Sequence, residues 1–231
     1  TPGGLLQVGG TNLVLFGGVF LVAVALGRPS RRELHGTSAP GWMHWLLGFA
    51  WSIALRLGVG VILFPVAAAS MALRGREGPA DLEGFRPKIE NLLNPEALAD
   101  PAYLLVCATF ISFLVAGLRE ELWRAGMIAG VARLLAGRVS PRQAELAGVA
   151  FAAVVFGFGH LTQGWAGVLL TGVLGLGLGG ILILRRSLAE VVIAHGFFDA
   201  TTFVALAILT NRDLLRRLGV DPTLLDPLLN R

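Results

Sequence analysis

Charged residues are scarce in this sequence: they make up 15% of its 231 residues, whereas an ordinary soluble domain has roughly 25%. Hydrophobic residues make up 55%. Low hydrophobicity with high net charge would indicate disorder, and this composition is the opposite. The composition therefore excludes a soluble globular enzyme and predicts an integral membrane protein.

Cysteine is also nearly absent. The single Cys107 has no partner for an intrachain disulfide, which excludes a disulfide framework and favours a packing role. The net charge is +4, but the cations lie singly and in pairs between apolar stretches rather than on one polar face. This pattern excludes nucleic acid as a partner, and membrane lipid is the expected one.

Long apolar runs are what the sequence has in place of charge. A membrane-spanning helix needs about 20 apolar residues. The runs predict an all-α, polytopic transmembrane helix bundle with about seven spans, at 11–27, 51–73, 101–118, 121–137, 143–161, 164–184 and 187–209. The first run could be a signal peptide, but no basic segment precedes it and no cleavage site follows before Arg28, which favours a retained span.

The polar stretch 74–100 divides the chain into an N-terminal transmembrane region with its polar loop, 1–100, and a denser helix bundle, 101–209. The tail 210–231 alternates leucine with arginine and predicts an amphipathic helix at the interface. Gly175 and Gly179, four residues apart, predict a close-packed helix and not a nucleotide site. Arg56 is expected either to extend toward the interface or to face the bundle. With seven spans, each side has eight loop cations, so the orientation stays open.

Ionisable side chains inside apolar runs point to function, because each costs at least about 2.5 kcal/mol in hydrocarbon. Six of them stand out: Glu120, Glu121, Arg124, His160, His195 and Asp199. His195 and Asp199 are four residues apart and share a helix face, as do Phe156 and His160. Arg124 can neutralise one of the two glutamates and leave the other with the free lone pair that a general base needs.

The positions of these groups along their helices allow them to lie at similar depths in the membrane. Glu120 lies 18 positions before Arg138 and His160 lies 18 after Arg142, so both are about 27 Å from a hairpin turn at 138–142. Each residue by itself has a structural interpretation, as a helix–helix hydrogen bond or an interfacial ion pair. Two histidines and two acids at compatible depths on three helices favour a chemical site.

Imidazoles and carboxylates in a secluded site suit hydrolysis by activated water: a carboxylate takes the proton, a histidine orients the water and the other groups stabilise the oxyanion. Glu120, His160, His195 and Asp199 could instead hold one Zn²⁺ with a position open for water. The cofactor is then either none or one zinc ion. The sequence contains no His-Glu-x-x-His, Gly-x-Ser-x-Gly or Gly-x-Gly-Asp motif, which excludes those designs.

Three motifs resemble those of the CPBP family of intramembrane proteases, which includes CAAX prenyl endopeptidases and is also called Abi. Its patterns are Glu-Glu-x-x-x-Arg, Phe-x-x-x-His and His-x-x-x-Asn or Asp. They correspond to 120–124, 156–160 and 195–199, and the resemblance covers 101–209. The arginine comes one residue early. We prefer to align Glu120 and Glu121 with the pair, since 126–128 then also match; the alternative places Arg119 first and Glu120 second.

The resemblance implies that Glu120 activates water with His160, that His195 and Asp199 position the water or stabilise the oxyanion, and that Glu121 with Arg124 holds the helix. It implies an intramembrane endopeptidase of a prokaryotic plasma membrane, acting on peptide or lipidated-protein substrates such as prenylated CAAX peptides. The alternatives are a non-catalytic immunity or scaffold protein of the same family and a proton-coupled transporter.

Overall fold

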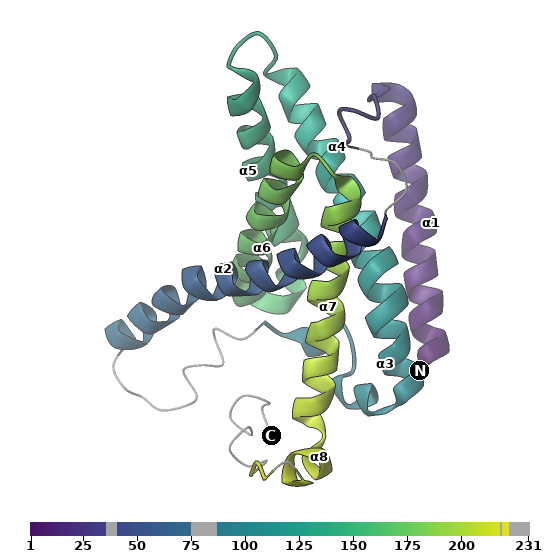
Figure 1. Ribbon diagram of the computed structural model, residues 1–231, viewed down its shortest axis with the longest axis vertical. Coiled ribbons are helices and arrows are strands. Elements are labelled where there is room, and N and C mark those ends of the chain that lie inside the picture. The colour runs from purple at the N-terminus through teal and green to yellow at the C-terminus, as the bar shows by residue number, and fades with distance from the viewer. Residues whose placement is uncertain (36–40, 75–86, 218, 222–231) are drawn as a thin grey trace.

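A computed structural model describes residues 1–35, 41–74, 87–217 and 219–221, and these residues are helical (Figure 1). The longer helices are α1 (Pro2–Gly27), α2 (Trp42–Arg74), α4 (Arg119–Leu134), α5 (Pro141–Gly159), α6 (Gly164–Arg185) and α7 (Leu188–Thr210). Shorter helical segments are η2 (Ile89–Asn91), η3 (Pro95–Ala99), α3 (Pro101–Val106), η4 (Cys107–Leu118), η5 (Leu161–Gln163) and α8 (Arg212–Arg217).

Five helices in the described ranges are long and apolar enough to cross a membrane: Pro2–Gly27, Trp42–Val66, Pro101–Leu134, Leu161–Arg185 and Leu188–Thr210. The chain is therefore an integral membrane protein, a polytopic helical bundle. The sequence predicted about seven spans, more than the five in the described ranges, for two reasons. The runs 101–118 and 121–137 form one continuous helix through α3, η4 and α4. The run 143–161 forms α5, whose first five residues include Arg142, Gln143 and Glu145.

The expected hairpin turn between the first and second motifs is present between α4 and α5. α4 ends at Leu134, and Ser140 caps α5 by accepting a hydrogen bond from the Gln143 backbone, while Gln143 bonds back to Ser140. Pro141 occupies the first turn, where its missing N–H costs nothing. These local signals end one helix and start the next, so α4 and α5 run antiparallel (Figure 1).

Glycines bring α5 and α6 close together, as the spacing of Gly175 and Gly179 predicts. A Cβ atom on Gly179 would lie 2.9 Å from the Val149 side chain, and one on Gly157 would lie 2.8 Å from the Val168 carbonyl oxygen. Larger residues would force these helices apart. The glycine-rich helix α6 is thus a packing helix, and it brings its backbone within reach of α4.

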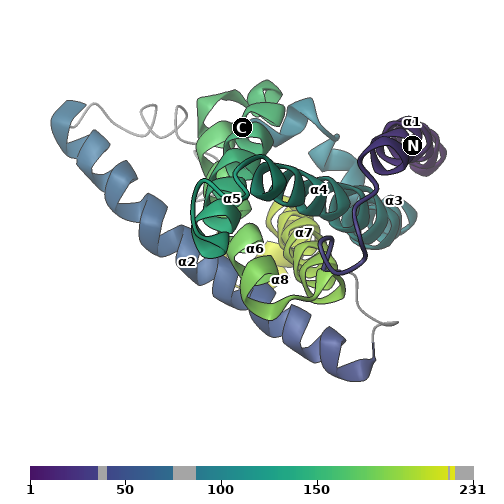
Figure 2. The same cartoon turned by 90° about the horizontal axis from the view of Figure 1, so that it is seen from above.

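α1 and α2 lie on the outside of this bundle (Figure 2). α1 packs against α3, η4 and α4, whereas α2 crosses α6 and α7 obliquely (Figure 1). The span predicted at 51–73 is the later part of one longer helix, Trp42–Arg74, with Pro65 inside it. The main core lies between α2, α4, α5, α6 and α7 and includes the fully buried Leu178, Leu182 and Val191. Of the predicted amphipathic tail, α8 is described and 222–231 lies outside the described residues.

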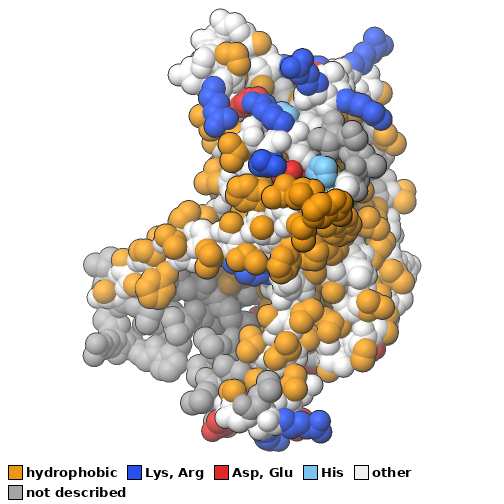
Figure 3. All heavy atoms as spheres, viewed as in Figure 1, with side chains coloured by type: hydrophobic (Ala, Val, Ile, Leu, Met, Phe, Trp, Pro, Cys, Tyr) orange, Lys and Arg blue, Asp and Glu red, His pale blue; other side chains and the backbone are white. Residues whose placement is uncertain are grey.

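Many cations lie at the upper end of the molecule in Figure 3, which we call the cationic end, and a smaller group lies at the lower end. Residues 28–35 meet the α6–α7 turn at the cationic end, since the Leu188 backbone donates to the His35 carbonyl at 2.9 Å. The arginines of residues 28–32 therefore lie at the same end as Arg186 and the α4–α5 hairpin. Seven spans would place these arginines on the side opposite Arg138, Arg142 and Arg186. The structure places them at the same end, because the two predicted runs at 101–118 and 121–137 form one span.

The ion pair between Arg133 and Glu33 predicts an acid-sensitive contact at this end. Arg133 donates to both Glu33 oxygens at 2.6 and 2.8 Å, and the Ser30 backbone and hydroxyl also donate to this carboxylate. The Arg133 hydrogen bond is the main reason that the pKa of Glu33 falls from 4.5 to about 2. Because the folded-state pKa is the lower one, the contact stabilises the fold above about pH 4.5 and is lost as the pH falls toward 2.

We expect the unfolding temperature in detergent to fall more steeply between pH 4.5 and pH 2 for the wild type than for Glu33→Gln. The difference will be small, because both side chains are largely exposed and salt screens them. Equal slopes for the two proteins would show that Glu33 does not anchor residues 28–35 to α4.

Candidate active site

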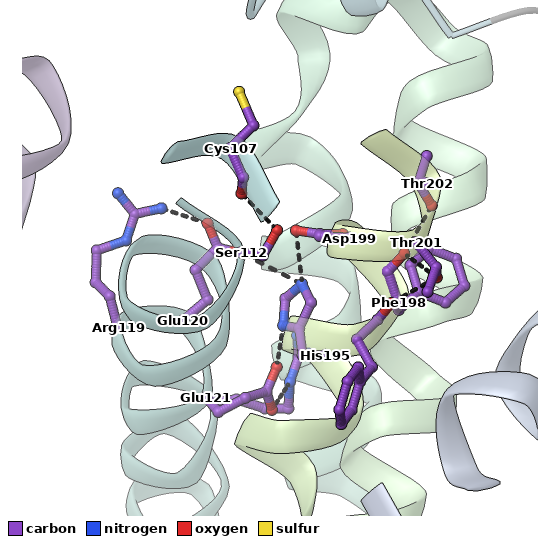
Figure 4. Close-up of polar contacts among 12 residues, drawn as sticks. Cys107, Ser112, Arg119, Glu120, Glu121, His195, Phe198, Asp199, Thr201 and Thr202 are labelled. Carbon is purple, nitrogen blue, oxygen red and sulfur yellow. Dashed lines mark hydrogen bonds and ion pairs between the residues drawn. The ribbon is translucent and has the colours of Figure 1, made fainter. Parts of the chain in front are cut away.

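A polar cluster lies where the first turn of α4 meets the middle of α7 (Figure 4). Glu120 and Glu121 begin α4, and His195 and Asp199 lie one turn apart on α7. The His195 Nδ1 atom donates to Glu121 Oε1 at 2.8 Å. Two motifs that are 74 residues apart in sequence are therefore in direct contact.

The inner part of this cluster is completely buried. Glu121, Arg124 and His195 are each 2% exposed or less. Arg124 Nε donates to Glu121 Oε2 at 2.8 Å, and its Nη1 donates to the Gly175 carbonyl of α6 at 3.3 Å. Both Glu121 oxygens are thus engaged, one by Arg124 and one by His195. Since a buried carboxylate needs such partners, Glu121 is suited to hold the site together.

The outer part of the cluster is more accessible. The side chains of Glu120 and Asp199 are 16% and 25% exposed. Both face the same His195 Nε2 atom, at 3.9 Å from Glu120 Oε2 and 3.8 Å from Asp199 Oδ2. These separations are longer than hydrogen bonds. Arg119 forms an ion pair with Glu120 (Figure 4). The two accessible carboxylates therefore both lie near His195 Nε2, while His195 Nδ1 is bonded to Glu121.

Phe156 brings the motif 156–160 into contact with the other two motifs. Its ring centroid lies 4.6 Å from that of His160 and 6.0 Å from that of His195, and the Arg124 guanidinium lies 4.4 Å above the ring. The Phe156 carbonyl accepts a hydrogen bond from His160 Nδ1 at 2.8 Å. In a neutral His160 ring this bond leaves the lone pair on Nε2. Helices α4, α5 and α7 thus all contribute to one cluster.

The helix that leads into Glu120 has an unusual winding. Residues Cys107–Leu118 form a π-helix of 12 residues, η4, although π-helices are mostly single turns and are frequent at functional sites. Inside it the Ser112 hydroxyl donates to the Cys107 carbonyl at 2.7 Å. A Cβ atom on Gly117 would lie 2.8 Å from the Val192 carbonyl oxygen, so the end of η4 is pressed against α7. This close approach brings the start of α4, with its two glutamates, beside α7.

Arg56 faces the bundle, which decides between the two alternatives that the sequence allowed. From α2 it donates to the Thr201 and Thr202 hydroxyls at 2.5 and 2.9 Å and to the Phe198 carbonyl. Its guanidinium also lies 4.4 Å from the Phe198 ring centroid. These contacts surround the residue before Asp199. Sequence reasoning did not include Arg56 in the site, and its only signal was a charge inside an apolar run.

Arg56→Met is expected to lower the free energy of unfolding by about 2 kcal/mol, since hydrogen bonds from a charged group to α7 are lost while the aliphatic part is kept. Unfolding in mixed micelles, followed by tryptophan fluorescence, measures this. Arg217→Met, on the exposed end of α8, is the matched control and should change little. An equal effect of the two substitutions would contradict the anchoring role of Arg56.

The zinc alternative is not supported by this arrangement. Within the ranges that the structure describes, no group of three or more His, Cys, Asp or Glu residues is placed to hold a metal ion. Of the predicted ligands, Glu120 and Asp199 lie 3.9 and 3.8 Å from His195 Nε2, and Glu120 is also paired with Arg119. His160 contacts Phe156. The donor set does not fit a closed zinc site.

This fold and cluster define a polytopic membrane protein with a buried glutamate–histidine site. Comparison with protein families matches residues 102–201 to the Rce1-like family, described as type II CAAX prenyl endopeptidase Rce1-like. Residues 102–201 are thus an Rce1-like domain of the CPBP (Abi) family, a family of CAAX prenyl endopeptidases. Comparisons with curated proteins and with solved structures find no match.

Proposed function

We propose that this protein is an intramembrane endopeptidase that hydrolyses peptide bonds of membrane-associated substrates through water activated by Glu120 and His160. The observation that carries the proposal is the different environment of two neighbouring glutamates. Glu121 is fully buried and has both oxygens engaged, whereas Glu120 is partly exposed and faces His195 Nε2. The family match supports the reaction class.

In the proposed reaction, Glu120 takes a proton from a water molecule, and the resulting hydroxide attacks the carbonyl carbon of the scissile peptide bond. His160, with its Nε2 lone pair, orients the water. His195, protonated on both ring nitrogens, donates from Nε2 to the oxyanion, and Asp199 positions the water. The proton on Glu120 then passes to the leaving amine as the C–N bond breaks. Glu121 and Arg124 hold His195 in place through its Nδ1 atom.

For the substrate we propose a membrane-associated peptide, with prenylated CAAX peptides as the first class to test, and for the location a prokaryotic plasma membrane. The purified protein should cleave a farnesylated CAAX peptide in detergent. His160→Ala should lower the rate by about a hundredfold or more, whereas His44→Ala, at the outer start of α2, should retain it. Equal rates for the two variants would contradict the site, and equal cleavage of the peptide without farnesyl would contradict the substrate class.

Metal dependence separates this mechanism from the zinc alternative. We expect activity to survive 1,10-phenanthroline, since the proposed nucleophile is a water molecule activated by Glu120. The measurement is the cleavage rate after chelation and after Zn²⁺ is added back. Loss of activity that only added Zn²⁺ restores would overturn the glutamate mechanism while leaving the cluster as the site of hydrolysis.

A further inference from the structure

An apolar groove runs along the side of the bundle, between α1 and α4. It has a volume of about 260 Å³, and Phe20 and Val24 of α1 and Trp123 and Met127 of α4 line it. α1 is the least buried of the candidate spans, so this groove lies at the lipid-facing periphery (Figure 2). It is separate from the polar cluster, since none of its lining residues belongs to that cluster.

Glycines on α4 make the groove. Gly126 and Gly130 are four residues apart and both line it. A Cβ atom on Gly126 would touch only Phe20, at 3.5 Å, and one on Gly130 would meet nothing within 4 Å. From Trp123 to Arg133 the groove follows ten residues of helix, or about 15 Å, which is half of the roughly 30 Å hydrocarbon thickness. Its length therefore corresponds to one leaflet.

A polar pocket of about 380 Å³ continues the groove at the cationic end. Ala129 and Arg133 line both cavities, and Leu34 of the groove is followed directly by His35 of the pocket. The pocket also contains Arg32 and Arg186. The apolar groove, about as long as one leaflet is thick, thus continues into the polar pocket near the helix ends.

The charge at the mouth of this pocket is positive. Glu33 and Glu145 in the lining are already paired with Arg133 and Arg186. Arg32 has no acidic partner in the part of the chain that the structure describes, nor have Arg28 and Arg31 beside it. The blue side chains at the upper end of Figure 3 include this region. The pocket therefore favours an anion over a neutral or zwitterionic group.

We propose that the groove and the pocket together form a binding site for one anionic glycerophospholipid. Its acyl chain occupies the groove beside Gly130, and its phosphate lies in the pocket and interacts with Arg32. The bound lipid fills the space between α1 and α4. These helices also meet through contacts of Phe16 and Phe20 with Trp123, through the Arg119 guanidinium over the Phe16 ring, and through the Arg133 contacts with residues 27–33. The site therefore couples α1 to the bundle through lipid.

Thermal unfolding of the full chain in neutral detergent tests the proposal, with phosphatidylglycerol, phosphatidylcholine or inorganic phosphate added. We expect phosphatidylglycerol to raise the unfolding temperature of the wild type more than phosphatidylcholine does, and phosphate alone to have little effect. Arg32→Glu should weaken the apparent affinity for phosphatidylglycerol at least about fivefold, as expected for a lost cation near the headgroup. Arg217→Glu at the opposite end is its control.

Gly130→Leu tests the groove itself. The added side chain enters open space, so the variant should fold and yet lose most of the stabilisation by phosphatidylglycerol. Gly18→Leu on α1, whose Cβ also meets nothing within 4 Å and which does not line the groove, should keep it. Stabilisation equal to wild type in both Gly130→Leu and Arg32→Glu would overturn the proposal, as would a full effect of phosphate alone.

Discussion

Glu120→Gln is expected to lower the rate of peptide cleavage by about a hundredfold to ten-thousandfold, the range that a general base contributes. Glutamine has nearly the same shape but cannot accept a proton from water. Because Glu120 is partly exposed and its ion pair with Arg119 lies at the surface of the cluster, the protein should still fold. Initial rates on the farnesylated peptide, together with the unfolding temperature, measure both effects.

The matched control is Glu145→Gln, which removes a glutamate that pairs with Arg186 at the far end of the bundle. This variant should cleave at nearly the wild-type rate. If Glu120→Gln keeps full activity while a folded Glu121→Gln is inactive, the base is Glu121 and the proposed roles of the two glutamates are reversed.

Arg124→Leu is expected to destabilise the fold by about 3–5 kcal/mol, the cost of removing one partner of a buried ion pair. The substitution leaves the Glu121 carboxylate buried, with only His195 to interact with it, and it removes the bond to the Gly175 carbonyl. The measurement is unfolding in mixed micelles followed by tryptophan fluorescence. Activity should fall as well, because Glu121 then no longer fixes the His195 ring.

Arg133→Leu on the same helix is the matched control. Its ion pair with Glu33 is largely exposed, so its loss should cost far less. The double variant Glu121→Gln with Arg124→Leu should recover part of the stability, because it removes the unpaired charge. A loss in Arg124→Leu no larger than in Arg133→Leu would contradict the view that the buried pair supports the site.

Much of the helix arrangement could be predicted from local signals. Ser140, Pro141 and Gln143 end one helix and cap the next, and this hairpin lies where the sequence places it. The glycines of α6 predict close packing, and α5 contacts them. The number of spans could not be predicted in the same way. Arg119 and Glu120 fall between two predicted runs, but in the structure they lie inside one helix, where they form an ion pair with each other. Next to them, His195 and Arg124 bond the buried Glu121.

The candidate residues were also named from sequence, but their relations were not. The i,i+4 spacing places His195 near Asp199, and it does not indicate that Glu121 binds the other side of His195. The role of Arg56 was equally invisible, since its partners Thr201 and Thr202 are about 145 residues away along the chain. Contacts between helices depend on how each helix is rotated about its axis, and no local pattern determines this rotation.

The sequence by itself determined that this protein lies in a membrane and which ionisable side chains lie within its apolar segments. Few charges in long apolar runs require a bilayer, and acids and histidines within those runs are too costly to be incidental. Only the tertiary structure decided which glutamate is buried and which is accessible, because burial depends on the packing of α4 against α6 and α7. It also decided that residues 28–35 join the α6–α7 turn, since the ends of helices meet only after the helices have packed.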